Sequence, residues 1–76
     1  MRVTFKWNGN LITADIFALV HNQERGHLVI HIGDETGFIC NNIHDTAAKR
    51  LIQDLRVYGY ADLSGLEFEW SDKMIL

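Results

Sequence analysis

The first part of the chain alternates apolar and polar residues, which is the pattern of half-buried β-strands. Apolar side chains stand at every second position in segments 3–7 and 12–20, and Asn8-Gly9 separates the two segments. Asn-Gly favours a two-residue type I′ turn, because both central residues of that turn need positive φ. The pattern therefore predicts a hairpin in which Phe5 lies opposite Ile12.

Two further apolar runs predict that the sheet continues. Segment 28–32 follows the polar loop 22–26, and the short run 38–41 follows a second turn that contains glycine. A symmetric loop at 22–26 places Val20 opposite Leu28 and keeps one face of the sheet apolar.

From Thr46 the apolar period changes to three and four residues, which is typical of an amphipathic helix. We expect this helix to run from about Thr46 to Tyr58. Asp45 is the expected N-cap, and Gly59 is the expected residue that ends the helix in a left-handed conformation. The predicted core-facing positions are Leu51, Ile52 and Leu55.

The last element is a strand in which Leu66, Phe68 and Trp70 alternate with two glutamates. The order ββββαβ indicates an α+β fold over residues 1–76, taken as a single domain. We expect an antiparallel sheet of four to five strands with one helix packed on one face. The other face of the sheet is left without a helix.

The composition narrows the classes of function. At 47% hydrophobic and 22% charged residues, the 76-residue chain is too apolar to be disordered. A net charge of −3 without a cluster of Lys or Arg argues against direct binding of nucleic acid. No apolar run is long enough to cross a membrane. The one cysteine cannot form an internal disulfide, so we expect a reducing compartment, the cytoplasm.

The four histidines and Cys40 are the residues best able to bind a transition metal. His27 and His31 share a strand face but lie more than about 10 Å apart along it. The expected register places His21 directly opposite His27, which supplies only two ligands. The sequence therefore predicts no metal and no cofactor.

Cys40, His44 and Asp45 have the residue types of a cysteine nucleophile, its base and an orienting acid. Asp45 is better interpreted as a helix cap, and Cys40 is better interpreted as a small apolar residue. The pattern leaves open which face of the sheet Cys40 occupies. No phosphate-binding glycine loop or HExxH helix is present. We therefore expect no catalysis.

The face opposite the predicted helix is unusually apolar. The expected register places seven residues on it: Asp15, Phe17, Leu19, His21, His27, Val29 and His31. A solvated antiparallel face normally carries polar residues, so this set is the candidate protein-binding surface. Two alternatives stay open: the C-terminal Met74-Ile75-Leu76 covers the face, or a bulge turns Phe17 inward.

The C-terminal part of the chain is acidic and forms a second candidate surface. Glu67, Glu69 and Asp72 lie on or beside the last predicted strand, where they are suited to meet a basic partner. The alternative is a set of merely solvated charges.

In size, acidity and order of elements, the chain resembles the small phage- and plasmid-encoded inhibitors of bacterial defence, of which anti-CRISPR proteins are the best known. The segment Leu28-Val29-Ile30-His31-Ile32, followed by Asp45-Thr46-Ala47-Ala48 and the helix, carries the resemblance. It implies blockade of a larger protein in the host-cell cytoplasm and assigns no functional residue.

The predicted function is a non-catalytic protein-binding inhibitor or adaptor that docks on a larger protein. One alternative is a homodimeric structural module. The second alternative is a small metal-binding or cysteine-dependent enzyme.

Overall fold

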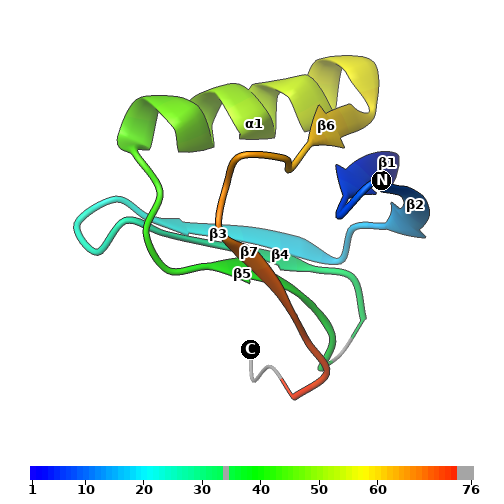
Figure 1. Cartoon of the computed structure of the whole chain (residues 1–76), viewed down its shortest axis with the longest axis horizontal. Coiled ribbons are helices and arrows are strands. Elements are labelled where there is room, and N and C mark those ends of the chain that lie inside the picture. Colours follow the sequence, from blue (N-terminus) through cyan, green and yellow to red (C-terminus); the bar gives the residue numbers. More distant parts are fainter. Residues whose placement is uncertain (34, 74–76) are drawn as a thin grey trace.

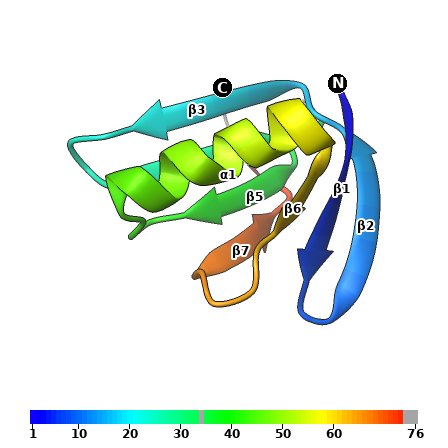
Figure 2. The same cartoon turned by 90° about the horizontal axis from the view of Figure 1, so that it is seen from above.

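The strands form two sheets, and the helix lies over the larger one (Figure 1). The computed structural model describes residues 1–33 and 35–73. In chain order the elements are β1 (Arg2–Trp7), β2 (Asn10–Asp15), β3 (Ala18–Asn22), β4 (His27–His31), β5 (Gly37–Cys40), α1 (Asp45–Tyr58), β6 (Tyr60–Asp62) and β7 (Phe68–Ser71). The smaller sheet stands beside the C-terminal end of α1 (Figures 1 and 2). The α+β class, with the helix on a four-stranded antiparallel sheet, is confirmed.

The smaller sheet contains the predicted N-terminal hairpin. Its strand order is β2-β1-β6, and the hairpin register is the predicted one, with Phe5 opposite Ile12. Asn8 and Gly9 have φ angles of 50° and 78°, as a type I′ turn requires. The third strand, β6, runs parallel to β1 and was not predicted, because three residues are too few for an alternating pattern.

The larger sheet has the order β3-β4-β5-β7, and all its neighbouring strands are antiparallel. The sequence predicted one sheet that included the N-terminal hairpin, and this is wrong. The predicted strand over 12–20 breaks at a corner: the Ile16 N–H donates to the Met1 carbonyl oxygen, whereas the Phe17 N–H donates to that of His31. Each of these bonds measures 2.7 Å, so consecutive residues are held by different sheets.

The corner also shifts the predicted register of β3 by one residue. Ala18 pairs with His31, to which the Phe17 N–H is already bonded, so two residues oppose one, as in a β-bulge. Val20 consequently lies opposite Val29, and not opposite Leu28 as expected. A shift of one residue turns every side chain of a strand to the other face, and this decides which residues of β3 are exposed.

The helix follows the predicted boundaries closely. Gly59 ends it with φ 65°, and the Gly59 N–H donates to the Leu55 carbonyl oxygen at 3.1 Å. The predicted N-cap is wrong, because His44 takes the cap position and makes no side-chain hydrogen bond there. Asp45 is instead the first helical residue, and its carboxylate lies 3.0 Å from the Lys49 ammonium. No helix in the part of the chain that the structure describes is long and apolar enough to cross a membrane.

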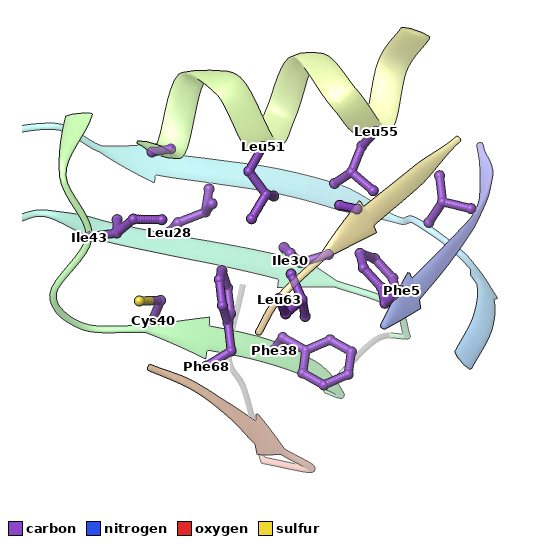
Figure 3. Close-up of a cluster of buried hydrophobic side chains, with 13 residues drawn as sticks. Phe5, Leu28, Ile30, Phe38, Cys40, Ile43, Leu51, Leu55, Leu63 and Phe68 are labelled. Atoms are coloured by element: carbon purple, nitrogen blue, oxygen red, sulfur yellow. The ribbon is translucent and has the colours of Figure 1, made fainter. Parts of the chain in front are cut away.

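The core lies between α1 and the larger sheet. Leu51 and Leu55 point from the helix onto side chains of the strands (Figure 3). Phe38 is fully buried and its ring contacts three others, with centroid distances of 5.5 Å to Phe5 and 5.1 Å to both Trp7 and Trp70. The Trp7 indole N–H also donates to the Phe68 carbonyl oxygen at 3.2 Å. The two sheets are therefore joined by aromatic packing around Phe38.

Candidate protein-binding surface

The face of the larger sheet that is turned away from α1 carries apolar side chains on three adjacent strands. Val20 lies opposite Val29, and Val29 lies opposite Ile39. Their neighbours along each strand, such as Leu28 and Phe38, point to the other face and are buried in the core. Val20 is 49% exposed, and Val29 and Ile39 are half-buried. An open antiparallel face is normally polar, so these three adjacent aliphatic residues are the candidate binding surface.

We call this surface the outer face and define it by its members: Ala18, Val20, Asn22, His27, Val29, Ile39 and Glu69. Glu69 lies opposite Ile39 on β7 and is exposed. The outer face therefore contains an apolar row, Val20, Val29 and Ile39, with a carboxylate at the β7 end of the row.

Of the residues predicted for this surface, His27 and Val29 lie on it. Leu19 and His21 do not, because the shifted register turns them toward α1, and Leu19 packs against the core. Asp15 belongs to the smaller sheet, where it lies opposite Arg2. The prediction for Leu19, His21 and Asp15 is therefore wrong.

His31 and Phe17 occupy special positions near the corner. The alternation of side chains along β4 places His31 on the outer side of the strand. His31 is nevertheless only 3% exposed, and its Nδ1 has no hydrogen-bond partner. His31 therefore offers no contact area, contrary to the prediction. Phe17 is 60% exposed, so the alternative in which a bulge turns it inward is wrong even though the bulge exists. The proposed covering by residues 74–76 lies outside the described residues.

Two residues of the outer face, Val20 and Ile39, were not predicted from the sequence. Ile39 lies between Phe38 and Cys40 in the sequence. Because side chains alternate along a strand, Ile39 faces away from the core if either neighbour is buried in it. Val20 carried no such signal, because its face depends on the bulge at Phe17 and Ala18, and that segment contains no glycine to mark it.

A polar cluster on the other side of β3 links this strand to the start of α1. His21 Nε2 lies 3.8 Å from Asp45 Oδ1, and the Lys49 ammonium lies 3.0 Å from Asp45 Oδ2. The His21 and Asp45 atoms are buried and have no hydrogen-bond partner. The distance between these two atoms is too long for a hydrogen bond. The cluster therefore places β3 beside the first turn of the helix.

The cysteine and histidine candidates are dispersed by the fold. Cys40 is fully buried and faces the core between Leu28 and Phe68, which fixes the face that the sequence left open. His27 lies opposite Asn22, so the expected pairing of His21 with His27 is wrong. Within residues 1–33 and 35–73, no group of three or more His, Cys, Asp or Glu side chains is placed to hold a metal ion.

A shallow groove of about 210 Å³ lies between α1, β6 and the loop after it. Its lining includes both apolar residues and the charged Arg50, Asp54 and Asp62. Hydrogen bonds from Ser64 hold the pKa of Asp62 below its usual value, and one of them joins the Ser64 N–H to Asp62 Oδ1 at 2.9 Å. Asp62 is therefore engaged in its own turn.

The predicted acidic surface lies at the β7 edge of the larger sheet. Glu67, Glu69 and Asp72 are all exposed, and β7 is the edge strand opposite to β3. The carboxylates therefore border the outer face on one side only.

Comparison with known proteins adds no relative. No protein-family model matches the chain, and no curated protein or solved structure matches it. The surfaces described above are therefore the basis for a functional proposal.

Proposed function

We propose that the protein is a non-catalytic protein-binding module that docks on a larger protein through the outer face. The observation that carries this proposal is the row Val20, Val29 and Ile39, which is aliphatic on three adjacent strands of a face that α1 does not cover. Burial of such apolar area contributes roughly 25 cal/mol per Å² to association. The row is a suitable centre for an interface with a polar rim.

The charges around the row indicate the chemistry of the partner. Glu69 ends the row, and Glu67 and Asp72 directly precede and follow β7. A partner with an apolar centre and Lys or Arg side chains facing the β7 edge is complementary to this arrangement. Such a module acts as an inhibitor or an adaptor by occupying the partner's surface. Blockade of a defence protein, as in anti-CRISPR inhibitors, is the specific form that we propose.

Site-specific photocrosslinking tests the surface. A benzoylphenylalanine at position 29, on the outer face, is expected to give an adduct of one defined mass in extract of the source cells. The same probe at Leu11 is the matched control, because Leu11 is 69% exposed but lies on β2 of the smaller sheet.

The proposal predicts an adduct from position 29 and none from position 11. Added salt is expected to lower the yield of the adduct from position 29, because salt screens the attraction between the carboxylates at the β7 edge and a basic partner. Identical adducts from both positions, or none from position 29, would contradict docking through the outer face.

A further inference from the structure

The edge strand β3 lacks the features that normally keep a sheet edge from pairing. Edge strands are protected by charged residues, proline or very short length. The sequence of β3 is Ala-Leu-Val-His-Asn, with no Asp, Glu, Lys, Arg or Pro over five residues. β3 has β4 as its only strand neighbour in the described sheet.

The other edges are better protected. β7 carries Glu69, β2 carries Asp15, and β6 has three residues and carries Asp62. Among the described edge strands, β3 is therefore the one that presents a row of backbone groups over five residues without a charged side chain. In an antiparallel pair, alternate residues direct their N–H and C=O groups away from the neighbour, so part of this row points outward.

We propose that a second copy of the chain pairs antiparallel along β3, which joins the two larger sheets into one of eight strands. This inference does not rest on docking of a larger protein. A twofold axis perpendicular to the sheet keeps both helices on the same side, and it requires that paired residues share a face. The register with the greatest overlap places Val20 opposite Val20 of the second copy, and Leu19 opposite His21.

The side chains suit this register on both faces. On the outer face, the half-exposed Val20 meets its own counterpart, so the rows of Val20, Val29 and Ile39 from both copies become continuous. On the helix side, an apolar residue faces a histidine, and no like charges are opposed. Cross-strand pairs of β-branched residues stabilise a sheet, whereas like charges directly opposite destabilise it.

The distribution of charge favours the same edge. The chain has a net charge of −3, and Glu67, Glu69 and Asp72 lie on or beside β7. Because β7 is the far edge from β3, pairing through β3 leaves the two acidic ends at opposite limits of the joined sheet. Repulsion between exposed charges so far apart is largely screened.

Sedimentation equilibrium over a concentration series tests the proposal. We expect twice the 8.7 kDa chain mass for the wild-type protein and the single-chain mass for Val20→Lys, with an unchanged circular dichroism spectrum. Leu11→Lys is the control, since it adds the same charge to an exposed apolar position on β2. A monomeric wild-type protein up to about 1 mM, or equal dissociation by both lysine variants, would overturn the proposal.

A disulfide experiment keeps the test decisive if Val20→Lys fails to fold. Directly opposed residues have Cβ atoms about 4.5–5.5 Å apart, so a small approach reaches the separation of about 3.5–4.5 Å that a disulfide requires. Val20→Cys is therefore expected to form a covalent dimer on mild oxidation much faster than Leu11→Cys, while the buried Cys40 stays unreactive. Equal rates for the two variants would refute pairing through β3.

Discussion

Replacement of Phe38 by alanine is expected to lower the free energy of unfolding by about 3–5 kcal/mol. Phe38 is fully buried, and its ring contacts Phe5, Trp7 and Trp70, so the substitution removes the aromatic packing that joins the two sheets. The total free energy of unfolding of a small domain is only about 5–15 kcal/mol. At the lower limit of this range, the substitution removes most of the stability. Urea denaturation followed by tryptophan fluorescence measures the loss.

Phe17→Ala is the matched control for Phe38→Ala. It removes the same side chain from a position that is 60% exposed, and exposed substitutions usually change stability by less than about 0.5 kcal/mol. Equal losses in the two variants would show that Phe38 is not the centre of the core.

Leu55→Ala is expected to cost about 2–5 kcal/mol, because it opens a cavity where α1 meets the sheet. Leu55 is fully buried, and it lies one turn after Leu51 on the same face of the helix. Val57→Ala is the control on the same helix, since Val57 is 61% exposed. Thermal unfolding should separate the two variants by many degrees. Similar melting temperatures would mean that α1 turns another face to the sheet.

The elements that local chemistry determines were predictable from the sequence. Asn8-Gly9 sets the register of the first hairpin, because its turn type admits only one pairing of the flanking residues. The helix and its end at Gly59 followed from the apolar period and from the left-handed conformation of the glycine.

The elements that depend on tertiary structure were not predictable. The corner at Ile16 and Phe17 forms because the two N–H groups find acceptors in different sheets, and no local residue type marks it. The bulge that follows shifted the register of β3, so Leu19 and His21 moved inward and Val20 moved outward. The predicted surface consequently combined residues of β4 that face away from α1 with residues of β3 that face toward it.

Docking through the outer face requires that this face is open to solvent. Methyl NMR with a soluble paramagnetic cosolute measures this directly, because the cosolute attenuates signals according to their exposure. In dilute protein, the methyl signals of Val20, Val29 and Ile39 are expected to be attenuated much more strongly than those of Leu28 and Ile30, which are fully buried on the opposite face. Protection of Val29 and Ile39 equal to that of Leu28 and Ile30 would show that the face is covered, and would contradict its use as a binding surface.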